Sequence, residues 1–150
     1  MKNAFSLALL CALAACGGSA DDSTPEAAPE NTPAAAPERF TVTIVSPVEG
    51  AFQEERDVAV VLRTTVPILP AGDMTPGTGH HHLYLDADLG DMSAPVPTVP
   101  GSIIHMGNGA TAYTFENVSS GPHRIIAVVA DGAHLPLQPL VVDTVNFVVE

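Results

Sequence analysis

The segment Phe40-Thr41-Val42-Thr43-Ile44 alternates apolar and polar side chains, which is the pattern of a strand with one buried face. Further along, Val58-Ala59-Val60-Val61-Leu62 is rich in β-branched residues, which favour strands. More strand-like segments occur around Leu83 and Leu85 and at residues 112–115, 124–130 and 141–149. Turn sequences such as Asn108-Gly109 and Asp131-Gly132 separate these segments at intervals typical of a β-sandwich.

The pattern predicts an all-β fold rather than an α/β fold. No segment shows a sustained 3.6-residue apolar period, and prolines interrupt residues 66–100. Six or seven short strands within residues 39–150 predict an immunoglobulin-like antiparallel β-sandwich of about seven strands. The chain has no tryptophan, so the Cys-Trp-Cys core of antibody domains is absent.

The N-terminus has the features of an export signal. Met1-Lys2-Asn3 is a short positive head, and the apolar run at residues 4–13 is too short for a bilayer, which needs about 20 residues. The following Leu13-Ala14-Ala15-Cys16 resembles the lipobox of bacterial lipoproteins, in which the cysteine accepts lipid before cleavage. Gly17, rather than Asp, follows the cysteine, and the resemblance then implies release to the outer membrane. The alternative is an ordinary secretory signal with an incidental cysteine.

The composition changes after Cys16. Residues 17–38 are rich in Gly, Ser, Ala and Pro, carry five acids and no base, and contain no aromatic residue. Such a segment cannot bury enough apolar surface to order itself, so it is predicted to be an extended tether. We therefore expect a lipoprotein signal peptide at 1–15, a lipidated Cys16 with a disordered tether at 16–38, and a β-sandwich domain at 39–150. The expected location is the cell envelope, lipid-anchored to the outer membrane and facing the periplasm.

Charge and cysteine content narrow the function. The formal net charge is −12, and the only bases are Lys2 and four arginines, which argues against a nucleic-acid partner. Residues 39–150 hold four arginines against twelve acids, a formal charge of −8 that attracts cations. Cys11 would leave with the signal and Cys16 would carry lipid, so no disulfide is expected. A Gly-rich phosphate loop, a nucleophile elbow and a Cys-His pair are all missing, so we expect no enzymatic activity.

All six histidines lie in residues 39–150. Within the triplet His80-His81-His82, alternation on a strand puts the first and third side chains on one face, about 6.6 Å apart, and His81 on the other. Two imidazoles at that spacing can bind one metal ion, and His105 can supply a third ligand. His134 and Met106 are possible further ligands. Imidazole suits both copper and zinc.

Each of these residues also has a structural interpretation. His81, on the apolar face, is expected to be a buried neutral imidazole that is hydrogen-bonded to the backbone. His123 follows a proline at the start of a strand and is expected to be structural as well. The methionines in predicted loops, Met106 among them, can fill gaps instead of binding metal.

Four motifs together resemble a bacterial family of small secreted proteins classed as a domain of unknown function. They are Gly79-His80-His81-His82-Leu83-Tyr84-Leu85-Asp86, Ile104-His105-Met106-Gly107-Asn108-Gly109, Gly121-Pro122-His123 and Ala130-Asp131-Gly132-Ala133-His134-Leu135-Pro136. The resemblance covers about Pro70 to Val149 and implies no activity. It also implies two further histidines, where this chain has Ile103 and Leu137.

Three functions compete on this evidence. The first is a membrane-anchored envelope lipoprotein that binds copper or zinc through its histidines. The second is a structural or protein-interaction module of the envelope without metal. The third, more remote, is a hydrolase with His82 or His105 as base. Convergence of His80, His82 and His105 on one point would favour the first.

Overall fold

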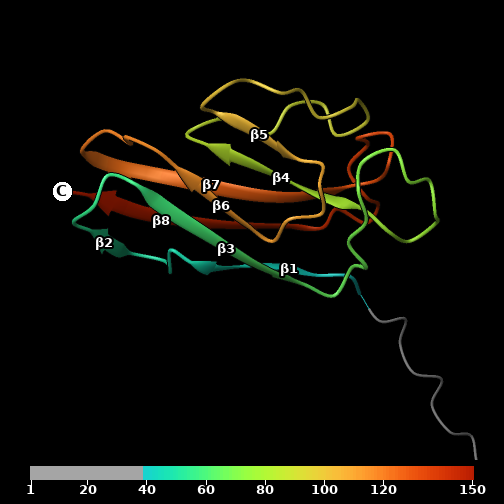
Figure 1. The fold of residues 1–150 in the computed structure, drawn as a ribbon, viewed down its shortest axis with the longest axis horizontal. Coiled ribbons are helices and arrows are strands. Elements are labelled where there is room, and N and C mark those ends of the chain that lie inside the picture. Colours follow the sequence, from blue (N-terminus) through green and yellow to red (C-terminus); the bar gives the residue numbers. More distant parts are fainter. Residues whose placement is uncertain (1–38) are drawn as a thin grey trace, which may run out of the picture. The chain divides into compact units, whose positions relative to one another are not determined.

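A computed structural model describes residues 39–150. The predicted signal peptide, Cys16 and the predicted tether lie outside the described residues. The described part is all-β and contains no helix. Its eight strands are β1 (Val42–Ser46), β2 (Ala51–Gln53), β3 (Val58–Thr64), β4 (His80–Leu85), β5 (Ile103–Met106), β6 (Ala112–Phe115), β7 (Gly121–Ala130) and β8 (Val142–Val149) (Figure 1). A search of the same residues for a helix able to cross a membrane finds none.

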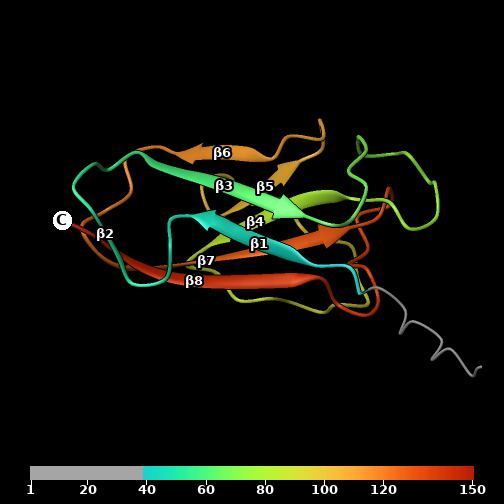
Figure 2. The same cartoon turned by 90° about the horizontal axis from the view of Figure 1, so that it is seen from below.

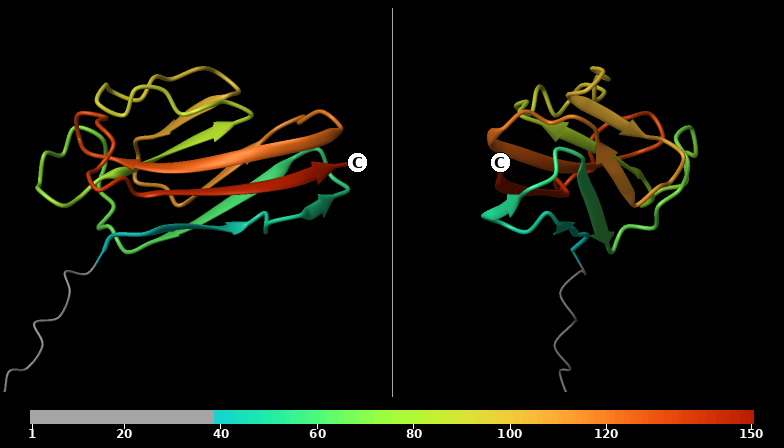
Figure 3. Two further views of the ribbon diagram at one scale, coloured as in Figure 1. Left: turned by 180° about the vertical axis from the view of Figure 1, so that it is seen from behind. Right: turned by 60° about the vertical axis from the view of Figure 1, so that its left-hand side comes forward.

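The strands form two sheets, which confirms the predicted β-sandwich. One sheet has the order β1-β3-β6 and the other has the order β2-β8-β7-β4-β5 (Figure 2). Every pairing is antiparallel except that of β2 with β8. The long strands β7 and β8 run side by side through the larger sheet, as two further views show (Figure 3).

Two of the eight strands were not predicted. The three residues of β2 are too few to show an alternation, and they form a strand because they pair in parallel with β8. The four residues of β5 were not identified as a strand, and Met106 was expected in a loop, but they pair with β4 at the edge of the sheet. Met106 therefore lies on a strand, and the loop placement expected for it was wrong.

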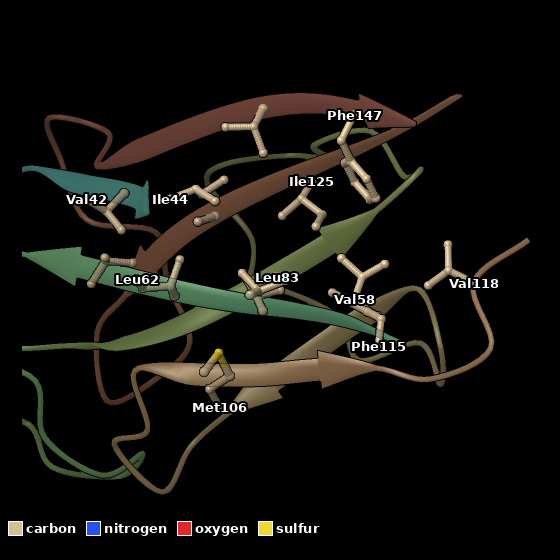
Figure 4. Close-up of a cluster of buried hydrophobic side chains, with 14 of the residues drawn as sticks. Val42, Ile44, Val58, Leu62, Leu83, Met106, Phe115, Val118, Ile125 and Phe147 are labelled. Atoms are coloured by element: carbon tan, nitrogen blue, oxygen red, sulfur yellow. The ribbon is translucent and has the colours of Figure 1, made fainter. Parts of the chain in front are cut away.

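The main core lies between the two sheets. Ile125, Leu83 and Phe147 from the larger sheet pack there with Val58 and Leu62 of β3 (Figure 4). These side chains are at most 5% exposed. Burial of a side chain of this size stabilises the fold by about 1.5–3 kcal/mol, so this layer supplies much of the folding free energy.

A second, smaller core covers the opposite face of the larger sheet. Tyr84, Ile126 and Val128 pack there with Val96 from the β4–β5 connection, and Leu140 from the β7–β8 connection packs against them. The larger sheet is therefore buried on both faces at β4 and β7. We call this second side its outer face.

Candidate metal site

Strand β4 places His80 and His82 on the outer face of the larger sheet. His80 lies opposite Ala130 and His82 opposite Val128, and both of these β7 residues belong to the outer core. Because side chains alternate along a strand, the two histidines share this face, and the side chains of both are completely buried. The residue before His80 is Gly79, and its position has no room for a side chain, because a Cβ there would lie 2.5 Å from the Ala130 carbonyl oxygen.

Strand β5 brings His105 to the same place. His105 is directly opposite His82 in the antiparallel pairing of β4 with β5, so their side chains lie on one face. The imidazole of His105 folds over Gly107, where a Cβ would lie 2.3 Å from both Cε1 and Nε2 of the ring. His105 is the most accessible of the three histidines.

The β7–β8 connection contributes His134. The Asp131 carboxylate oxygen Oδ1 accepts hydrogen bonds from the backbone N–H groups of Ala133 and Leu135, each at 2.9 Å. This turn holds His134 in a left-handed conformation with φ of 68°. The backbone carbonyl of His134 also accepts a hydrogen bond from the N–H of Val96, at 2.9 Å. The connection is therefore tied both to its own turn and to the β4–β5 connection.

The ring nitrogens of these four histidines face one another. Nε2 of His80 and Nε2 of His82 are 3.0 Å apart, and Nε2 of His105 and Nε2 of His134 are 3.2 Å apart. Across the pairs, His80, His82 and His105 offer ligand atoms that all lie within 4.8 Å of one another. Three imidazoles thus converge on one point and can hold a metal ion there.

Burial and the neighbouring imidazoles lower the pKa of His80, His82 and His105 and so favour their neutral forms. Burial is the largest cause that lowers the pKa of His80 from 6.5 to about 4, with His105 and His134 adding to it and Asp131 opposing it. Burial, followed by the neighbouring histidines, lowers the pKa of His82 to about 3. The pKa of His105 is also lowered, first by burial and then by His134. Neutral imidazole is the form that coordinates a metal ion.

The Nδ1 atoms of His80 and His82 are buried and have no hydrogen-bond partner. Their Nε2 atoms have only each other, and a neutral pair can share just one hydrogen bond because one ring must donate and the other accept. A cation at this point would accept both lone pairs at once. The donor set therefore fits a bound metal ion.

Residues 58–150 match the sequence profile of a protein family, and this segment runs from the start of β3 to the C-terminus. The chain belongs to the family described as Domain of unknown function (DUF4399). The matched segment includes all six histidines and extends the expected resemblance upstream from Pro70. No curated protein and no solved structure matches the chain.

The other two histidines of the DUF4399 domain lie apart from the cluster. His81 points to the inner face, where its Nδ1–H donates to the Ala110 carbonyl oxygen at 3.0 Å and burial lowers its pKa. His123 lies seven residues before Ala130 on β7, about 23 Å away along the strand. Its Nδ1 lies 2.7 Å from Oδ2 of Asp86 and its Nε2 lies 2.7 Å from the Ser119 carbonyl oxygen. Hydrogen bonds thus anchor both rings within the domain.

The structure does not bring Met106 to the cluster. It lies opposite His81 in the β4–β5 pairing, so its side chain points into the main core, where it is 4% exposed (Figure 4). Ile103, at a position where the resemblance implies a histidine, packs with Tyr84 in the outer core. Leu137, the other such position, packs against the main core.

The sequence interpretation missed the residues of the DUF4399 domain that position the ligands. Asp131 shapes the turn that carries His134, and Gly107 leaves the space that the His105 ring occupies. The Asp131-Gly132 pair was visible as a turn signal, since Asp side chains hydrogen-bond to the backbone two residues on. No local signal marks Gly107 as a neighbour of the ring.

Proposed function

We propose that this DUF4399 protein binds a transition-metal ion, copper or zinc, through His80, His82 and His105. We further propose that it does so as an envelope lipoprotein that is anchored in the outer membrane through lipid on Cys16. The observation that carries the metal proposal is the convergence of three ligand atoms within 4.8 Å of one another. Imidazole is a ligand for both ions, and the Irving-Williams order favours copper wherever it is available.

The hydrogen bonding of the histidines favours metal binding over a purely structural role. His81 and His123 have partners of the kind that structural histidines have, a backbone carbonyl and, for His123, a carboxylate as well. His80 and His82 are more deeply buried than His123, yet they contact each other and leave Nδ1 unsatisfied. A metal ion bound to both Nε2 atoms would replace the single hydrogen bond that this neutral pair can share.

Electrostatics support the same function. The formal charge of −8 on residues 39–150 attracts cations over a distance. The histidines then need to supply only geometry and a neutral donor. A structural or protein-interaction module of the envelope is the second candidate, because the same cluster also joins the β7–β8 connection to β5 through the contact of His134 with His105.

Chelator competition tests the proposal. The metal-free protein would be titrated with Zn(II) or Cu(II) against a chromophoric chelator, and His105→Ala should weaken binding by more than about tenfold. His123→Ala is the matched control, since it removes a histidine outside the cluster and should leave the affinity unchanged. Equal and weak binding by the natural protein and a His80→Ala/His82→Ala double variant would refute metal binding and support the interaction module.

A further inference from the structure

We propose that His134 is a fourth ligand and that the four imidazoles impose tetrahedral coordination, which makes this a closed Zn(II) site. The inference rests on the proposed metal binding and specifies its ion class and its coordination. It concerns the histidine that the β7–β8 connection supplies, which lies outside the three-histidine group. The arrangement of the four rings in space supports this assignment.

The six distances between ring centres distinguish a tetrahedron from a square. They are 4.8 Å for His80–His82, 4.9 Å for His80–His105, 5.0 Å for His80–His134, 5.2 Å for His82–His105, 5.7 Å for His82–His134 and 4.7 Å for His105–His134. With metal–nitrogen bonds of about 2.0–2.1 Å, a tetrahedron would space all ring centres about 5.2 Å apart. A square plane would instead give four distances of about 4.5 Å and two of about 6.4 Å. The near-equal spacing is that of a tetrahedron.

The nitrogen atoms agree with this geometry. A tetrahedral metal ion holds its imidazole nitrogens about 3.3 Å apart. The Nε2 atoms of His80 and His82 are 3.0 Å apart, and those of His105 and His134 are 3.2 Å apart. Both pairs therefore already have ligand spacing, and across the pairs the ligand atoms of His80, His82 and His105 lie within 4.8 Å of one another.

The backbone holds His134 in place without help from a metal. Oδ1 of Asp131 accepts two backbone hydrogen bonds within the turn, and the Gly132 carbonyl accepts one from Gly72 N–H at 3.0 Å. Gly132 is packed against the β3–β4 connection so closely that a Cβ there would lie 2.1 Å from the Asp73 carbonyl oxygen. The backbone that carries the fourth imidazole is thus positioned by contacts that do not involve the other three histidines.

Four protein ligands leave no open coordination position. Structural zinc sites have four protein ligands, whereas catalytic zinc sites keep one position for water or substrate. Zn(II) has no d-electron preference that resists a tetrahedron, while Cu(II) prefers tetragonal surroundings. The site therefore suits holding Zn(II) and does not suit hydrolysis by a metal-bound water.

Cobalt substitution tests the inference on the full chain. Tetrahedral Co(II) absorbs visible light much more strongly than five- or six-coordinate Co(II), so the spectrum reports coordination number directly. The natural protein should give the intense tetrahedral bands. His134→Gly, which accepts the φ of 68° without strain, should lose most of that intensity and bind Zn(II) more than about tenfold more weakly. Leu135→Ala is the matched control on the same turn and should behave as the natural protein does.

The outcomes separate the two proposals. Weak cobalt bands in the natural protein, or an unchanged spectrum and affinity in His134→Gly, would refute the fourth ligand and leave metal binding through three histidines intact. Failure of the natural protein to bind either Co(II) or Zn(II) would refute both. If His134→Gly does not give a strand-type circular dichroism spectrum, His134→Asn replaces it, because Asn also tolerates the left-handed conformation.

Discussion

Acidification should destabilise the metal-free protein well before its carboxylates titrate. The folded-state pKa values of His80 and His82, about 4 and about 3, lie below the ordinary value of 6.5 that applies to the unfolded chain. Between pH 6.5 and pH 4 the unfolded chain therefore binds more protons than the folded one. The stability that these residues contribute is fully present above pH 6.5 and is lost as the pH falls through this window.

The magnitude follows from the linkage. Each histidine that stays neutral in the fold costs about 1.4 kcal/mol of stability per pH unit below its unfolded pKa. At pH 5 the two together should lower the free energy of unfolding by about 4 kcal/mol relative to pH 7. Burial lowers the pKa of His81 and that of His105 as well, which acts in the same direction. Against a usual total of about 5–15 kcal/mol, the effect is large.

Urea unfolding in the presence of a chelator at pH 7, 6 and 5 measures this dependence. A His80→Gln/His82→Gln variant is the control, because it removes both titrating groups and keeps polar side chains of similar size. Its unfolding free energy should vary much less between pH 7 and pH 5. The reasoning would be refuted by a natural protein as stable at pH 5 as at pH 7, or by a variant that keeps the full pH dependence.

Three further predictions concern single residues. His123→Ala should lower the free energy of unfolding by about 2 kcal/mol in urea titrations, because it removes two hydrogen bonds, while the metal affinity stays unchanged; an unchanged stability would contradict this. Gly107→Ala should push the His105 ring aside and weaken Zn(II) binding in chelator competition, with a strand-type circular dichroism spectrum retained; natural affinity would show that the ring needs no such space. Intact mass after membrane extraction should show acyl chains on Cys16, and an unmodified, freely soluble protein would disprove lipidation.

Local sequence patterns predicted most of the fold because most strands here are long enough to show their alternation. The patterns at 58–62, 124–130 and 141–149 correspond to β3, β7 and β8. Strands β2 and β5 were not predicted, because neither Ala51-Phe52-Gln53 nor Ile103-Ile104-His105-Met106 shows a clear alternation of polar and apolar residues. Both segments form strands by pairing with a neighbour. Because β5 was not predicted, Met106 was expected in a loop and was counted as a possible ligand. The pairing of β5 with β4 instead points the Met106 side chain into the main core.

The sequence by itself determined the fold class, the family resemblance and the shared face of His80 and His82, because these depend on alternation and composition along the chain. It also identified His105 and His134 as possible partners but could not show that they meet the first two. Only the tertiary structure decided this, through the register of β5 against β4 and the turn set by Asp131. His105 and His134 thereby meet histidines that lie 23 to 54 positions away in the sequence, and such separations leave no trace in local periodicity.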